Sequence, residues 1–181
     1  MAQFIAFDEE VEVNGRTIYT IVGALEIGKE YREEILAKHG IVPEPDTWHS
    51  QQLWLDAFKE IAETIGQNTL FMIGKAIPEH ADFPPGINNL EQALKSIDVA
   101  YHMNHRNGEI GHYQLTHFDK ERKEATMVCN TPYPSEFDRG IITSMLRQFR
   151  PANSFRYDVI LDISKETRIK GGESCTYKIV W

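Results

Sequence analysis

The spacing of apolar residues changes along this chain, from a helical period in the first half to a strand period at the end. Between residues 53 and 65, apolar side chains recur at steps of three and four, which predicts a helix with one wide buried face. Between residues 175 and 181, every second residue is apolar, which predicts a strand with one buried face. Helices that precede a cluster of antiparallel strands predict the α+β class.

The remaining elements follow from the same two periods and from turn residues. We expect helices at residues 29–39, 69–77, 89–104 and 136–149, and irregular chain around Pro43, around Pro45 and through residues 78–86. We expect a first hairpin around Asn14-Gly15, which pairs residues 10–13 with 17–24, and a second hairpin, which pairs residues 111–118 with 125–129. Two further strands, residues 156–163 and 167–170, are expected before a tight turn at Gly171-Gly172.

These elements predict a single domain spanning residues 1–181. A helical half, about residues 1–105, is expected to pack on an antiparallel sheet of about four strands in residues 110–181, with one interrupting helix. The length of 181 residues is ample for one hydrophobic core.

The net charge of −8 falls entirely within the first 65 residues, partly on helix faces that we expect to be solvated. With no block of lysine and arginine, the chain is not expected to bind nucleic acid. No apolar run approaches the roughly 20 residues of a membrane span. Residues 1–10 lack the features of a signal peptide, and the two cysteines are too few for a disulfide framework, so we expect a cytoplasmic location.

Histidines near one predicted helix end raise the question of a metal site. His102 and His105 stand three residues apart and are expected to share a helix face, whereas His112 and His117 fall on opposite faces of a strand. A single ion could use the first two and one strand histidine. Because no carboxylate or cysteine stands at a typical zinc spacing, we predict no metal site, and the helix dipole offers another reason for histidines there.

No catalytic motif is present, so we predict no catalytic residue and favour a function other than catalysis. Cys175 alternates with buried positions and is expected in the core. Cys129 ends a strand and is expected to be more exposed, with no helix N-terminus before it and no histidine nearby in sequence to activate it.

The segment from Cys129 to Gly140 is the best-marked local site. Two prolines hold Tyr133 in a stiff turn, and Ser135 and Asp138 stand at the spacing of a helix cap. We expect either a purely structural elbow or a pocket for a polar or anionic ligand, formed by Tyr133, Arg139 and the helix N-terminus.

The order of these elements, together with the run from Gly171 to Ile179, resembles one superfamily. It contains the haem–nitric-oxide/oxygen-binding (H-NOX) domains, the 4-vinyl-reductase domains and the transport-particle (TRAPP) subunits. The resemblance implies a pocket for a small hydrophobic ligand between the helices and the sheet, or a closed scaffold. The candidate ligand-binding residues, each of which core packing would also explain, are Trp54, Phe58, Phe71, Met72, Tyr101, Cys129, Tyr133, Arg139 and Met145.

The haem-binding branch of this superfamily has two motifs that the chain lacks. Members of that branch have a histidine that binds the haem iron just after the stretch that corresponds to residues 87–90, and the chain has Glu91 at this position. At the position of a Tyr-x-Ser-x-Arg motif that holds the haem propionates, the chain has Cys129, Thr131 and Tyr133. We therefore predict no cofactor. Haem held in another geometry remains an alternative, with His80, His102 or His105 as the ligand.

Together these observations favour a non-enzymatic domain that senses a small ligand or binds a protein in bacterial-type signalling. The expected partners are a small hydrophobic or polar organic molecule, a protein partner and a second copy of the chain. Three alternatives stay open: a haem-based sensor of nitric oxide or oxygen with atypical ligation, a homodimeric scaffold of the TRAPP type, and an enzyme that uses Cys129, Tyr133 or Arg139.

Overall fold

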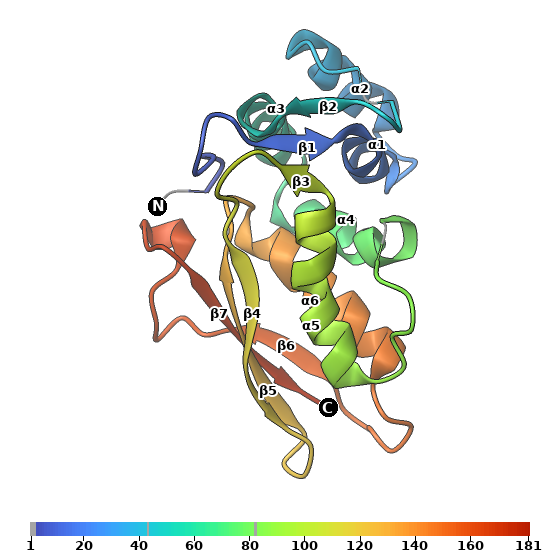
Figure 1. Ribbon diagram of the computed structural model, residues 1–181, viewed down its shortest axis with the longest axis vertical. Coiled ribbons are helices and arrows are strands. Elements are labelled where there is room, and N and C mark those ends of the chain that lie inside the picture. Colours follow the sequence, from blue (N-terminus) through green and yellow to red (C-terminus); the bar gives the residue numbers. More distant parts are fainter. Residues whose placement is uncertain (1–2, 43, 82) are drawn as a thin grey trace.

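The computed structural model describes residues 3–42, 44–81 and 83–181. Within these ranges the chain forms six α-helices, one short 3-10 helix and two antiparallel sheets (Figure 1). None of the helices among these residues combines the length and apolarity needed to cross a bilayer. The α+β class predicted from the two hydrophobic periods is confirmed.

A small sheet with strand order β2-β1-β3 lies at one end of the molecule (Figure 1). Its strands come from three distant parts of the chain, and three helices pack beside it. These elements are β1 (Glu12–Asn14), β2 (Trp48–Ser50), β3 (His105–Arg106), α1 (Gly15–Gly23), α2 (Lys29–Lys38) and α3 (Gln51–Ile65). This sheet ties residue 105, which follows the last helix of the first half, to the start of the chain.

The larger sheet has the order β4-β5-β7-β6 and is antiparallel throughout. Its strands are β4 (His112–Asp119), β5 (Glu124–Asn130), β6 (Asp158–Leu161) and β7 (Cys175–Val180). The hairpin predicted between residues 111–118 and 125–129 is confirmed. In β7 the predicted face is buried, since Cys175, Tyr177 and Ile179 are shielded from solvent.

Helices α5 (Leu90–Met103) and α6 (Ser135–Phe149) pack against each other and against the larger sheet, and α4 (Gln67–His80) packs on α6 (Figure 1). Helices α4 and α6 cross closely because each has a glycine at the contact. A Cβ on Gly74 would stand 2.1 Å from the carbonyl oxygen of Phe137, and one on Gly140 would stand 2.3 Å from that of Phe71. Two helix backbones can approach this closely only without side chains between them.

The hairpin predicted around Asn14-Gly15 is wrong. Asn14 instead caps α1, because its side-chain oxygen accepts a hydrogen bond from the amide of Arg16 at 2.8 Å. Ile18, Ile21 and Val22 are buried at helical spacing, a pattern that β-branched residues obscured in the sequence. The strand before the turn therefore pairs with β2 and β3, and sequence reasoning missed this small sheet.

Three further predictions fail locally. The strand expected at residues 167–170 is a 3-10 helix, Arg168–Lys170. Pro78 lies inside the last turn of α4, whereas irregular chain was expected from this residue onward. Asp82 of the same expected segment, and Pro43 of the earlier expected loop, lie outside the described residues. Ser135 does not cap α6: it is the first helical residue, and Pro134 precedes it at the cap position.

Candidate functional site

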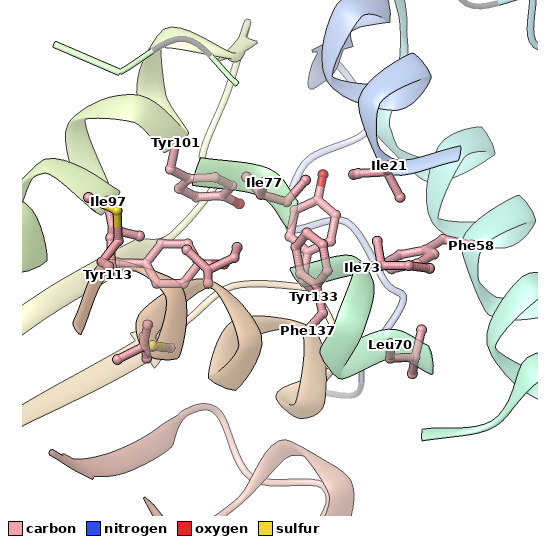
Figure 2. Close-up of a cluster of buried hydrophobic side chains, with 14 of the residues drawn as sticks. Ile21, Phe58, Leu70, Ile73, Ile77, Ile97, Tyr101, Tyr113, Tyr133 and Phe137 are labelled. Atoms are coloured by element: carbon pink, nitrogen blue, oxygen red, sulfur yellow. The ribbon is translucent and has the colours of Figure 1, made fainter. Parts of the chain in front are cut away.

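A cavity of about 50 Å³ lies where α1, α4, α5 and α6 meet β4 (Figure 2). This volume holds a few water-sized molecules. Its walls are apolar and aromatic, with few polar groups. The lining residues are Thr17, Ile21, Ile77, Ala81, Phe83, Ile97, Ala100, Tyr101, Asn104, His105, Tyr113, Tyr133, Phe137 and Ile141.

His105 supplies the imidazole of this cavity. It lies two residues beyond the end of α5, and its side chain turns inward, so that the residue is only 7% exposed. Nδ1 donates to the carbonyl oxygen of Tyr101 at 2.8 Å, because a carbonyl can only accept. The lone pair is therefore on Nε2, which accepts a hydrogen bond from the Tyr133 hydroxyl at 2.9 Å.

The protein holds His105 in its neutral form. Burial lowers the pKa of this imidazole from 6.5 to about 4, and the nearby His102 contributes to the shift. The hydrogen bond to the carbonyl of Tyr101 opposes the shift without cancelling it. At neutral pH the cavity thus contains an uncharged imidazole whose accepting nitrogen faces a tyrosine hydroxyl.

Several polar groups close to Tyr133 are buried without a hydrogen-bond partner among the described residues. They are both amide atoms of the Gln51 side chain and the indole Nε1 of Trp54. Burial raises the pKa of Tyr133, and the neighbouring Gln51 and Trp54 side chains counteract part of this rise without meeting hydrogen-bond geometry. Unpaired buried groups cost free energy, so they mark a place where a polar ligand atom or a water would be stabilised.

Stacked aromatic rings lead from α3 to the cavity, where Phe137 and Tyr133 belong to the lining (Figure 2). Trp54 stacks on Phe58 with ring centroids 5.0 Å apart, and Phe58 meets Phe137 edge-on at 5.4 Å. Phe137 in turn lies 5.4 Å from Tyr133. This continuous stack fixes the Tyr133 ring, because aromatic pairs at such distances favour defined relative orientations.

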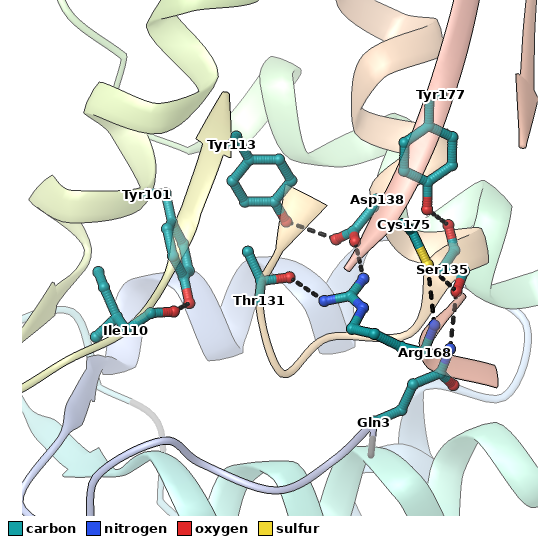
Figure 3. Close-up of polar contacts among 10 residues, drawn as sticks. All are labelled: Gln3, Tyr101, Ile110, Tyr113, Thr131, Ser135, Asp138, Arg168, Cys175 and Tyr177. Atoms are coloured by element: carbon teal, nitrogen blue, oxygen red, sulfur yellow. Dashed lines mark hydrogen bonds and ion pairs between the residues drawn. The ribbon is translucent and has the colours of Figure 1, made fainter. Parts of the chain in front are cut away.

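A buried ion pair lies behind the cavity, beyond Tyr113 (Figure 3). The guanidinium of Arg168 donates to the Asp138 carboxylate and to Thr131 Oγ1, the latter at 2.7 Å. The hydroxyl of Tyr113 donates to the second oxygen of Asp138 at 2.6 Å. Burial raises the pKa of Asp138, and the charge of Arg168 opposes this rise. Sequence reasoning missed Arg168, which it placed on a strand.

Both cysteines are fully buried. Burial raises the pKa of the Cys129 thiol well above its usual range, with the Asp138 charge as a further cause. Cys129 was expected to be more exposed, and this expectation is wrong, because β5 pairs with a neighbour on both sides at this residue. A protonated, inaccessible thiol is a poor nucleophile.

The structure separates the nine candidate ligand-binding residues into three groups. Tyr101 and Tyr133 line the cavity. Arg139 lies away from the cavity, where its guanidinium stacks over the Phe71 ring at 4.2 Å and pairs with Glu136 at 2.6 Å. Tyr133 and Arg139 therefore do not share the pocket expected at the elbow. The second group is buried but does not line the cavity, and it consists of Trp54, Phe58, Cys129 and Met145. Met72 is exposed and, with Arg139 and Phe71, makes up the third group.

The predicted shared face of His102 and His105 is also wrong. His105 points into the cavity, whereas the side chain of His102 is 42% exposed on the outside of α5. The chain turns into β3 at His105, so the helical spacing no longer applies there.

Solved structures share this fold at low sequence identity. An H-NOX domain of T. tengcongensis carrying a substitution matches with a TM-score of 0.63 and 12% identity, over 92% of this chain and 96% of that chain. An oxygen-complexed H-NOX domain related to soluble guanylate cyclases matches with a TM-score of 0.59 and 15% identity, over 91% and 89%. A structure from work on haem distortion in the H-NOX family gives 0.62 and 14%, over 93% and 94%. The chain therefore has the H-NOX fold.

No protein family model and no curated protein sequence matches the chain. The structural neighbours nevertheless contradict the prediction that the chain takes no cofactor. They are H-NOX domains, which bind haem, and one of them was solved to probe the function of haem distortion in that family. Haem, rather than no group, is the cofactor to which the fold points.

The side chains around the cavity do not accommodate haem as they are arranged here. The volume of about 50 Å³ is far below the roughly 300–1,000 Å³ of typical ligand pockets. Among the described lining residues there is no lysine or arginine to pair with two propionates. At the two family motifs, Glu91 is on the surface, paired with Lys95 at 2.6 Å, and Thr131 is bonded to Arg168. Among the described lining residues, His105 supplies the one imidazole, a side chain that commonly binds haem iron.

Proposed function

We propose that this chain, which has the H-NOX fold, is a sensing domain for a small ligand that binds in the cavity against His105 and Tyr133. The observation that supports this proposal is an apolar cavity in which the neutral imidazole of His105 accepts a hydrogen bond from the hydroxyl of Tyr133. Sites of this composition bind mainly by apolar contact and use a few polar groups to orient the ligand.

The dimensions of the cavity favour a ligand of only a few non-hydrogen atoms. An apolar cavity of about 150 Å³ binds benzene or xenon. One of about 50 Å³ is too small for benzene and suits a single xenon atom or a dissolved diatomic gas. The ligand can accept a hydrogen bond from Tyr133 if that hydroxyl turns away from His105, or it can take up the unused hydrogen-bonding capacity of Gln51 and Trp54.

The position of the cavity gives a route from binding to a signal. Its walls come from α1, which belongs to the small-sheet end, and from α5 and α6, which cover the larger sheet. A ligand that fills the cavity therefore adds contacts between these two parts. It shifts the equilibrium toward whichever arrangement of α1 against α6 it binds more tightly.

Xenon is a suitable probe because it is apolar, inert and held by dispersion contacts alone. We expect saturable shifts of methyl signals from Ile77 and Ile97 in a xenon titration followed by NMR. Ala100→Leu fills the cavity and should abolish them. Val99→Leu is the matched control, since Val99 is exposed on the same helix. Unsaturable shifts in the wild-type protein, or equal shifts in both variants, would count against the proposal.

Haem binding through His105 is the second candidate, favoured by the neutral imidazole whose Nδ1 is held by a backbone carbonyl. It requires Tyr133 to release Nε2 and the aromatic wall to open. A haemin titration followed by absorbance tests it. A Soret band that His105→Ala removes and His102→Ala retains would support haem ligation. A spectrum equal to that of free haemin would exclude this candidate and leave the small-ligand proposal intact.

A further inference from the structure

Three residues on the outer side of α5 and β4 form a cluster with metal-ligand chemistry. Asp98 and His102 stand one turn apart on α5, and His112 begins β4. Each offers one ligand atom, and the three atoms lie within 4.8 Å of one another. Ligands of a tetrahedral zinc ion stand about 3.3 Å apart, so modest side-chain rotations would close the set around an ion.

The backbone already orients two of these side chains. The Tyr113 amide donates to Asp98 Oδ1 at 2.7 Å, which fixes the carboxylate beside the start of β4. Nδ1 of His102 lies 2.9 Å from the Asp98 carbonyl oxygen and must donate to it, which leaves the other ring nitrogen with its lone pair. Metal-binding histidines and carboxylates commonly have such supporting hydrogen bonds.

The two imidazoles also lie close together. Their ring centroids are 5.0 Å apart, and Nδ1 of His112 is 3.5 Å from Asp98 Oδ1. The side chains of Asp98, His102 and His112 are 32%, 42% and 47% exposed, so an ion can enter from solvent. No lysine or arginine is found in an ion pair with Asp98 among the residues described.

We propose that Asp98, His102 and His112 bind a divalent transition-metal ion, with Zn²⁺ as the best match. Two imidazoles and one carboxylate are the donor set of zinc and its neighbours rather than of Ca²⁺ or Mg²⁺, which prefer oxygen ligands. Three protein ligands leave a coordination position open to water.

The bound ion would join α5 to β4 on the side opposite the cavity. Tyr101 and Tyr113, the neighbours of His102 and His112 in the chain, both line that cavity. A metal clamp would therefore restrict the two elements that form the cavity wall. This proposal does not depend on the ligand-sensing function, because the ion and the cavity occupy opposite faces of the same elements.

A second cluster provides an internal competitor. His117, Asp119 and Glu124 also bring their ligand atoms within 4.8 Å of one another, at the loop end of the β4–β5 hairpin. Arg122 lies 3.9 Å from both carboxylates and supplies the positive charge that an ion would bring. Asp119 Oδ1 already accepts the amides of Glu121 and Arg122. This cluster is therefore the weaker candidate.

The test is isothermal titration of the untagged full chain with Zn²⁺, repeated with Co²⁺ to read coordination from its visible spectrum. We expect one ion per chain. His102→Ala and His112→Ala should each weaken binding by more than about 100-fold, because loss of a direct ligand exceeds loss of a supporting contact. Asp98→Asn keeps an oxygen for the Tyr113 amide but removes the charge, and it should also weaken binding.

His117→Ala is the matched control, since this histidine is similarly exposed on β4 and belongs to the competing cluster. Retained binding in this variant, with loss in the other three, supports the proposal. No Zn²⁺ binding by the wild-type chain, unchanged binding in the three variants, or loss in His117→Ala overturns it. Circular dichroism of each variant shows whether a loss of Zn²⁺ binding reflects unfolding. If an alanine variant fails to fold, Zn²⁺ binding by Asp98→Asn still tests the proposal.

Discussion

Arg168 and Asp138 form an ion pair from which solvent is almost fully excluded, their side chains being 1% and 0% exposed. They come from the 3-10 helix and from the first turn of α6, 30 residues apart. Thr131 accepts a second hydrogen bond from Arg168, and Tyr113 donates to the other oxygen of Asp138, while Nε of Arg168 has no hydrogen-bond partner among the described residues. The pair therefore ties the end of the chain to the elbow and, through Tyr113, to the cavity wall.

Removing one partner of this pair should destabilise the fold strongly. Arg168→Met leaves the Asp138 carboxylate buried without its cation, and we expect a loss of about 3–5 kcal/mol in the free energy of unfolding. Urea denaturation measures it. Arg139→Met is the control, because the partly exposed pair of Arg139 and Glu136 should contribute about 0–1 kcal/mol. Equal losses in the two variants would contradict the role given to the buried pair.

His105 should make stability depend on pH in a defined window. Its folded pKa of about 4 lies below 6.5, so between these values the unfolded chain binds a proton that the folded protein excludes. The contribution is present above pH 6.5 and is lost progressively as the pH falls toward 4, by about 3 kcal/mol in total.

His105→Gln should flatten this part of the pH profile of the unfolding free energy. His102→Gln, on the exposed side of the same helix, should leave most of it in place, because burial, the larger cause of the lowered His105 pKa, is unchanged. The carboxyl of Asp162 has a pKa of about 2, lowered by its hydrogen bonds to Lys178 and Ser164, so its effect appears at lower pH. A wild-type profile that stays flat between pH 6.5 and 4 would rule out a buried neutral imidazole.

The crossing of α4 and α6 should tolerate no side chain at its two glycines. A methyl group at Gly74 or Gly140 meets a backbone carbonyl that cannot rotate away, so the helices must move apart. We expect Gly74→Ala and Gly140→Ala each to cost about 1–3 kcal/mol in thermal or urea unfolding.

Gly23 provides the control for this effect. It ends α1, and a Cβ added there has no atom within 4 Å. Gly23→Ala should therefore stabilise the protein by about 0.4–1 kcal/mol, through reduced freedom of the unfolded chain. If all three substitutions acted alike, the close helix crossing would not be the cause.

Neither cysteine should react readily in the folded protein. Both thiols are buried, and the pKa of Cys129 is raised by burial, so we expect labelling by iodoacetamide at neutral pH to be limited by opening of the structure. Mass spectrometry should show both thiols labelled rapidly in urea. Rapid labelling of Cys129 alone, without urea, would instead support the hypothesis of an enzyme that uses this residue.

The sequence by itself determined the elements with a strong local signal. Apolar spacing identified α3, and the Asn89 cap and the alternation from Cys175 identified α5 and β7, because each signal lies within one element. A hairpin between β4 and β5 also followed, since the loop that joins them is short. The class and the superfamily resemblance could be read from this order of elements.

Tertiary structure decided what depends on distant contacts. Residues 15–23 are helical because Ile18 and Ile21 meet the core, which outweighs the strand preference of β-branched residues. His105 faces inward while His102 faces out, because the chain leaves α5 for a strand that pairs with β1, near the start of the chain. The partnership of Arg168 with Asp138 likewise has no local signal. Burial and pairing across the chain assign these roles, and spacing along it does not encode them.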